Sequence, residues 1–373
     1  MSVNHTLRAW LRRAFGRTPT RSVGKHGAGR RLVRPRLEEL ENRLVLSHLL
    51  TVTTSNDTHA INPGSGTGLD SRGQISLRSA LETADAVGSS ASNLFTINVP
   101  SGTYNLTLGF LQVGSTADAD VVVNGTDLPA NIVIKQTDNT DPVFNLNPAL
   151  NANVQIAIAS VEITGGNAQA FGGGGIVGGG AGNSLMLNDV IVTGNASHNG
   201  PGGGGIEFDG GNLTLTNCTI SNNTAFGGTG GGLNFQPRNI AGSLIINGST
   251  FTGNSATPTI SSTAGLGGAL CVNGSAGNTY SVTGSTFTGN QASVAGGAVD
   301  NAHGTLFFNF NRVVGNSAPS GSGLSNASAA DASVDASNTW WGSNLDPSTL
   351  AGLIAGPVTS TPWLVLGASA NPT

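Results

Sequence analysis

A repeat of about thirty residues constrains this chain more than any other feature. Six short segments end in Gly-Asn or a close variant, from Val161-Glu-Ile-Thr-Gly-Gly166 to Asn311-Arg-Val-Val-Gly-Asn316. Successive segment ends are 29, 28, 31, 36 and 26 residues apart, a mean of 30. Such a period predicts a stacked array, because one short unit cannot bury its apolar face without its neighbours.

Apolar residues keep a fixed register within this repeat. The residues ten, eight and three positions before each segment end are all apolar: Ile156, Leu185, Leu213, Leu244, Tyr280, Leu306, Ile158, Leu187, Leu215, Ile246, Val282, Phe308, Ile163, Val192, Ile220, Phe251, Phe287 and Val313. The first two positions alternate with polar residues, which is typical of a β-strand. A glycine cluster ending in one aliphatic residue, such as Gly202 to Ile206, predicts a third short strand in each repeat.

The length of these strands favours a parallel β-helix. A four-residue strand stacked on its own copies at about 4.8 Å pairs its backbone with the coils on both sides. We therefore expect an all-β, right-handed parallel β-helix, a solenoid, since a β-propeller needs longer strands in each unit. The asparagines at the segment ends are expected to form a hydrogen-bonded ladder of Asn195, Asn223, Asn254, Asn290 and Asn316.

Both ends of a solenoid expose strand edges that need a cover. The amphipathic stretch 75–85, with Leu77 and Leu81 apolar, predicts a short capping helix within residues 75–90. The coils then occupy residues 95–335. Residues 336–367 form the C-terminal cap, where Trp340, Trp341 and Trp363 are expected to cover the last coil.

Charge divides the chain into two parts. Residues 1–43 carry eleven basic and three acidic side chains, a net charge of +8, whereas the rest carries five basic and 17 acidic ones, a net charge of −12. We expect residues 1–47 to be a disordered basic targeting tail and residues 48–373 to form the β-helix. The acidic folded part argues against nucleic acid as a partner. No apolar run approaches the roughly 18 residues that a transmembrane helix needs.

Several motifs resemble known families. Phe251-Thr-Gly-Asn254 with Gly267-Gly-Ala-Leu270 resembles the repeats of chlamydial polymorphic outer-membrane proteins, and so does the matching pair at 287–290 and 296–299. Residues 75–85 and the Asn-Thr-Trp-Trp-Gly end resemble the two ends of bacterial right-handed β-helix repeat proteins, although Ile75 and Ser79 replace their Cys and Glu. The segment 34–43 is similar to the N-terminal motif of planctomycete surface proteins. These resemblances imply export to the cell surface or the medium.

Parallel β-helices also include pectate lyases and polygalacturonases, which use clustered carboxylates and, in the lyases, Ca²⁺. Glu207 and Asp209 share one face of a strand, about 7 Å apart by strand geometry, a spacing compatible with an inverting glycoside hydrolase. Asp300 falls in the same column but about 14 Å away, and Arg238 can neighbour Asp209. The competing interpretation is that these groups are solvated on an outer strand face. The two cysteines, Cys218 and Cys271, fall in different columns, so no disulfide is expected.

The weakly charged ladder of Asn, Thr, Ser and Gly favours binding over catalysis. We expect a non-catalytic secreted or cell-surface protein, adhesin-like or binding glycan or matrix, as a monomer or with weak self-association. A polysaccharide lyase or glycoside hydrolase using Glu207, Asp209 and Arg238 is the alternative function. A purely structural spacer is a further alternative. No cofactor is expected, with Ca²⁺ the one ion to test.

Overall fold

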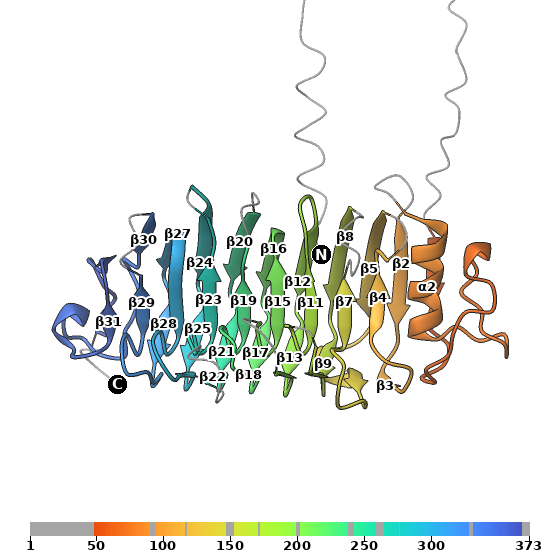
Figure 1. The fold of residues 1–373 in the computed structure, drawn as a ribbon, viewed down its shortest axis with the longest axis horizontal. Coiled ribbons are helices and arrows are strands. Elements are labelled where there is room, and N and C mark those ends of the chain that lie inside the picture. Colours follow the sequence, from red (N-terminus) through yellow and green to blue (C-terminus); the bar gives the residue numbers. More distant parts are fainter. Residues whose placement is uncertain are drawn as a thin grey trace, which may run out of the picture. The chain divides into compact units, whose positions relative to one another are not determined.

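Alternating apolar and polar residues build the strands, and stacked coils supply their hydrogen bonds. The computed structural model describes residues 48–89, 94–115, 118–146, 153–170, 172–198, 202–237, 242–258, 265–275, 277–327 and 331–367. These residues form a parallel β-solenoid with one α-helix at its N-terminal end (Figure 1). The predicted disordered tail, residues 1–47, lies outside the described ranges. Arg238, a predicted site residue, also lies outside them.

Three parallel sheets run along the solenoid. Sheet I contains β1 (His48–Thr51), β2 (Phe95–Val99), β5 (Ala119–Gly125), β8 (Val154–Ala159), β12 (Ser184–Asn188), β16 (Gly211–Thr216), β20 (Gly242–Asn247), β24 (Thr279–Thr283), the second half of β27 (Val299–Asn309), β30 (Ala332–Asp335) and β32 (Val358–Thr359). Sheet II contains β3 (Gly102–Leu106), β6 (Ile132–Gln136), β9 (Glu162–Thr164), β13 (Ile191–Thr193), β17 (Thr219–Ser221), β21 (Thr250–Thr252), β25 (Thr286–Thr288) and β28 (Arg312–Val314).

Sheet III contains β4 (Leu111–Val113), β7 (Phe144–Leu146), β11 (Ile176–Gly179), β15 (Ile206–Asp209), β19 (Leu233–Phe235), β23 (Leu270–Asn273), the first half of β27, β29 (Leu324–Asn326) and β31 (Ile354–Ala355). A strip of shorter strands lies between sheets II and III along the chain, an element that the repeat did not predict. It consists of β10 (Asn167–Ala168), β14 (Ala196–Ser197), β18 (Thr224–Phe226), β22 (Ser255–Thr257) and β26 (Gln291–Ala292).

The core is the set of inward columns that the repeat predicted. All eighteen apolar residues of the predicted register are buried, with at most 3% of each exposed. Burying one such side chain contributes roughly 1.5–3 kcal/mol relative to leaving it in water. Toward the C-terminal end the column becomes aromatic, and the rings of Phe251 and Phe287 stack with their centroids 4.9 Å apart.

The predicted asparagine ladder is confirmed. Asn223 Nδ2 donates to Oδ1 of Asn254 at 3.0 Å, and the same oxygen accepts the backbone N–H of Asn223 at 3.1 Å. The pattern repeats at every step from Asn195 to Asn316. The left-handed backbone position is the residue before each asparagine, such as Gly253 with φ +63°. The turn and the ladder therefore depend on two adjacent residues with different roles.

A second internal ladder runs parallel to the first. The backbone N–H of Cys218 donates to Ser249 Oγ, that of Ser249 to Ser285 Oγ, and that of Ser285 to Asn311 Oδ1. These residues follow the turn between sheets I and II. Both cysteines are free thiols, as the sequence predicted from their different columns.

The glycine clusters bring the backbones of successive coils together at the entrance to sheet III. The N–H of Gly204 donates to the carbonyl of Gly230, and that of Gly205 to Gly231. A Cβ atom at Gly204 would lie 2.4 Å from the carbonyl oxygen of Gly231, so no side chain fits. Glycine is required here by close backbone approach, and the φ angle of Gly204 is not left-handed.

Both ends carry the elements that the sequence predicted as caps. Helix α2 (Leu77–Val87) begins with a capping box between Ser76 and Ser79, and Leu77 and Leu81 are buried in the core. At the other end Trp341 is 3% exposed and its ring centroid lies 6.5 Å from that of Phe308. Trp340 lies under the guanidinium of Arg312, and Trp363 is partly buried against the core. Three 3₁₀ turns, η1 (Pro63–Ser65), η2 (Pro129–Asn131) and η3 (Pro347–Thr349), complete the described elements.

Candidate functional site

Glu207 and Asp209 lie in β15, as predicted, but the expectation of a solvated face is wrong for Glu207. Only 4% of Glu207 is exposed. The reason is that the glycine segments of two coils lie across it: a Cβ at Gly172 would be 2.8 Å from Glu207 Cγ. Backbone without side chains thus covers the outer face of sheet III at this position.

The buried carboxyl group has a full set of partners. Gly203 N–H donates to Glu207 Oε2 at 2.6 Å, and Asn234 Nδ2 donates to both carboxyl oxygens. Asp209 forms a further hydrogen bond with the group. Burial raises the pKa of Glu207 well above its usual value, and the charge of Asp209 raises it further. Burial and the neighbouring carboxyl group of Asp209 therefore favour the neutral form of Glu207.

Direct contact between the two carboxyl groups bears on the hydrolase alternative. An inverting glycoside hydrolase holds its two carboxyl groups about 6.5–9.5 Å apart so that a water molecule fits between them. Glu207 and Asp209 instead share a hydrogen bond, although their positions in the strand are two residues apart. The geometry of this pair therefore favours a structural role over catalysis of hydrolysis.

Glu207 begins a buried polar column on sheet III. In-register pairing aligns it with the residues that follow it on the next coils: Asn234, Cys271, Asp300 and Ser325. Each of these five residues is at most 8% exposed. Burial raises the pKa of Asp300 to about 6, although a hydrogen bond from Ser325 opposes the shift. Burial, followed by the charge of Asp300, raises the pKa of the Cys271 thiol.

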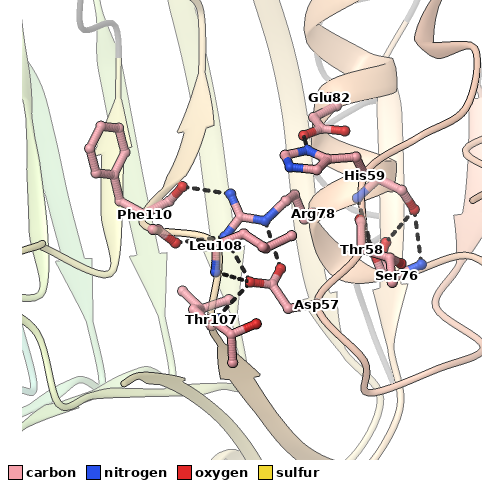
Figure 2. A network of polar contacts seen from close by, with 12 residues as sticks. Asp57, Thr58, His59, Ser76, Arg78, Glu82, Thr107, Leu108 and Phe110 are labelled. Atoms are coloured by element: carbon pink, nitrogen blue, oxygen red, sulfur yellow. Dashed lines mark hydrogen bonds and ion pairs between the residues drawn. The ribbon is translucent and has the colours of Figure 1, made fainter. Parts of the chain in front are cut away.

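A second polar cluster joins the capping helix to the first coils (Figure 2). Arg78 of α2 is 6% exposed and pairs with Asp57 through Nε and Nη2, at 2.6 and 3.0 Å. Its remaining bonds go to the carbonyl oxygens of Gly109 and Phe110. Asp57 Oδ2 also accepts the N–H groups of Thr107 and Leu108. The pair therefore clamps the helix to the loop between β3 and β4.

A pocket of about 320 Å³ opens beside this clamp. It is lined by His59, Arg78, Leu81, Glu82, Leu108, Gly109, Phe110, Leu111, Gln112 and Asp141. His59 is paired with Glu82, and Arg78 already makes four hydrogen bonds, so these charges are mostly matched within the protein. Burial raises the pKa of Asp141, and the charge of Asp138 adds to the shift. No sequence motif indicated this pocket, because its residues come from four segments up to 82 positions apart.

Among the described residues, sheet I has more strands than sheet II or sheet III, so its outer face extends over the most coils. From β8 to β24 and in the second half of β27, its outward residues are Gln155, Ala157, Ala159, Ser184, Met186, Asn188, Asn212, Thr214, Thr216, Ser243, Ile245, Asn247, Thr279, Ser281, Thr283, Thr305, Phe307 and Asn309. None of them is charged. Neighbouring coils exchange hydrogen bonds here, as between Ser243 and Asn212 and between Thr283 and Asn247. Uncharged Asn, Thr and Ser side chains, the residue types on which the predicted binding function depends, make up most of this face.

The central column of this face alternates between large apolar and small or polar side chains. Paired residue by residue, ten successive coils read Leu49, Thr96, Val122, Ala157, Met186, Thr214, Ile245, Ser281, Phe307 and Asp335. Met186, Ile245 and Phe307 are 49%, 39% and 41% exposed. Asn188, Asn247 and Asn309 stand two residues after them, on the same coils. The central column therefore alternates with a period of two coils, although the chain itself repeats every one.

Threonine dominates the outer face of sheet II. Thr219, Thr250 and Thr286 form one column, and Thr164, Thr193, Thr252 and Thr288 belong to the next. Ile191 occupies the first column one coil before Thr219. This face shows no two-coil alternation. It can therefore serve as a control for substitutions on the outer face of sheet I.

Comparisons with protein-family models, with characterised protein sequences and with solved structures gave no match. Among the described residues, no helix is long and apolar enough to cross a membrane. The same residues contain no group of three His, Cys, Asp or Glu side chains placed to hold a metal ion.

Proposed function

We propose that the chain is a non-catalytic extracellular protein that binds glycans or another surface polymer, as an adhesin or matrix component does. The observation that carries this proposal is the outer face of sheet I, where uncharged Ser, Thr and Asn side chains stand in register over successive coils. Such a face offers many weak hydrogen bonds along one direction, which suits a polymer. The motif resemblance to exported β-helix proteins supports an extracellular location.

The arrangement of the carboxyl groups supports binding over catalysis. Glu207 is enclosed by backbone and shares a hydrogen bond with Asp209. A general acid must reach the glycosidic oxygen of its substrate within hydrogen-bonding distance. Glu207 lies beneath the glycine segments at Gly172 and Gly203, where a sugar cannot reach it without local opening.

One experiment separates binding from catalysis. The full chain is incubated with neutral and uronic-acid polysaccharides, with and without Ca²⁺, and both retention on the polymer and new reducing ends or unsaturated products are measured. We expect retention without product. Product formation that is lost in Glu207→Gln or Asp209→Asn would overturn the proposal and establish the enzyme alternative. Neither retention nor product from any polymer would leave the spacer as the function.

A further inference from the structure

The two-coil alternation on sheet I sets a length scale that a ligand must match. Parallel strands lie about 4.8 Å apart, so the exposed apolar residues Met186, Ile245 and Phe307 recur about every 10 Å along the solenoid. Outward residues two apart in a strand are separated by about 7 Å, so Asn188, Asn247 and Asn309 follow the apolar column as a parallel row. From β12 to β27 these two columns thus form a one-dimensional lattice with one apolar platform and one amide in each period.

From this lattice we infer that sheet I binds a linear, neutral β-1,4-linked polysaccharide lying along the solenoid axis. In an extended β-1,4-linked chain each sugar is rotated by about half a turn relative to the last, so a disaccharide is the repeating unit. Its length is close to the two-coil period. This inference rests on the proposed function and names the class of glycan that the same face recognises.

Each part of the period has a matching chemical role. One sugar of the disaccharide lays the C–H groups of its ring on an apolar residue such as Ile245, while the amide of Asn247 contacts its hydroxyl groups. The next sugar, turned over, presents hydroxyl groups to the hydroxyl side chains of Ser281 and Thr283. The lack of charge over these coils disfavours uronic acids and cationic glycans.

The alternation also argues against an unspecific apolar patch. Met186, Ile245 and Phe307 are separated by Thr214 and Ser281, so no two of them are on adjacent coils. A surface that associates through continuous apolar area would join them. A second copy of the chain remains an occupant that the test must distinguish, because exposed apolar residues also support self-association.

The test measures the affinity of the full chain for cello- and chito-oligosaccharides of increasing length by titration calorimetry. We expect affinity to rise in steps of two sugars, about tenfold for each disaccharide that reaches another platform, the factor equal to one apolar contact of moderate size. Maltohexaose and oligogalacturonate should bind at least tenfold more weakly. A smooth rise with each single sugar would overturn the inference.

Three variants locate the site. Ile245→Thr removes the central platform and should weaken binding of the longest oligosaccharide about tenfold. Ile191→Thr makes the same change on the outer face of sheet II and should alter affinity less than about twofold. Thr214→Ile adds apolar area on the wrong coil, and we expect weaker binding because the sugar above it loses a hydroxyl partner. Tighter binding by Thr214→Ile, or equal effects of the two Ile→Thr changes, would contradict the inference.

Two readouts keep the possible failures apart. Thermal unfolding of each variant shows whether a loss of binding reflects a loss of the fold. Retention on another polysaccharide without binding to β-1,4-linked chains would overturn this inference and leave the proposed function standing, whereas no retention at all overturns both. Sedimentation equilibrium tests the second copy: dimerisation that Ile245→Thr abolishes, with no change in glycan affinity, assigns the face to self-association and also overturns the inference.

Discussion

Asn234 Nδ2 lies 3.1 Å from Oε1 and 3.0 Å from Oε2 of Glu207, so one amide from the next coil contacts both oxygens of a buried carboxyl group. Such a contact does not require a charge on Glu207. With the N–H of Gly203 and a hydrogen bond to Asp209, it satisfies a neutral carboxylic acid. The buried polar column that Glu207 begins therefore contributes to the fold. The contribution of each of its residues to protein stability can be measured by substitution.

Glu207→Gln should change the free energy of unfolding at pH 7 by less than about 1 kcal/mol, because the raised pKa favours the neutral acid, which the amide resembles in shape. Glu207→Ala should lose about 2–4 kcal/mol, since it leaves a cavity and removes the partner of Gly203 N–H. Urea denaturation of both variants measures the difference. A Gln variant as unstable as the Ala variant would show that Glu207 is ionised in the folded protein.

Asp300 should make the protein less stable as pH rises from 4 to 7. Its pKa is raised by burial from 3.8 to about 6, so the stability it contributes is complete below pH 4 and is lost as pH rises through 6. The difference corresponds to about 3 kcal/mol. Asp300→Asn should flatten this part of the pH–stability curve.

The measurement for Asp300 is chemical denaturation at closely spaced pH values, for wild type and variant together. Two neighbours in the column are also titratable, Glu207 and Cys271, and burial raises the pKa of each. Glu207 is unchanged in the variant, and the Cys271 thiol, whose pKa is raised well above its ordinary value of 9.0, does not titrate between pH 4 and 7 in either protein. An Asp300→Asn curve parallel to the wild-type curve between pH 4 and 7 would contradict the prediction.

Asn254→Ala should cost about 2–5 kcal/mol. It removes the acceptor for two N–H groups of Asn223 and the donor to Ile220 and Asn290, all in the buried ladder. Asn188→Ala, on the exposed face of sheet I, is the matched control and should change stability by less than about 0.5 kcal/mol. Comparable losses in the two variants would show that the internal ladder contributes little.

Two glycine substitutions separate close packing from backbone conformation. Gly204→Ala places Cβ 2.4 Å from the carbonyl oxygen of Gly231, so the stacked coils must move apart. Gly289→Ala has open space around its Cβ but keeps a φ of +65°. We expect a loss of about 1 kcal/mol for Gly289→Ala and several times more, or failure to fold, for Gly204→Ala. Thermal unfolding and yield of folded protein provide the measurement.

The sequence predicted the inward-facing part of the fold well, because that part is periodic. Every coil needs an apolar residue at the same three positions, so residues such as Leu213, Ile220 and Phe287 recur in a fixed register. The asparagine ladder was predictable for the same reason. The short strands between sheets II and III were missed, because two or three residues such as Ala196–Ser197 carry no periodicity.

The candidate sites were harder to predict, and the reasons differ. Strand alternation places Glu207 on the outer side of β15 but does not reveal that glycine backbone covers it. Arg78 and Asp57 are 21 positions apart, and Asp57 lies in a loop outside the repeat, so no periodic pattern indicated their pairing. The alternation on sheet I was hidden because coil lengths vary from 26 to 36 residues, so outward positions align only when the strand pairing is known.

The two-coil period on sheet I bears on how such a chain can change length. Solenoids lengthen by duplicating coils, and any whole number of coils preserves the inward columns. On the outer face, one added coil would shift the alternation by one coil, so that every residue beyond the insertion would be out of phase with those before it. Only an even number of coils leaves the outer pattern in phase, so about sixty residues, not thirty, is the unit that gene duplication or protein design must copy to extend the surface without altering it.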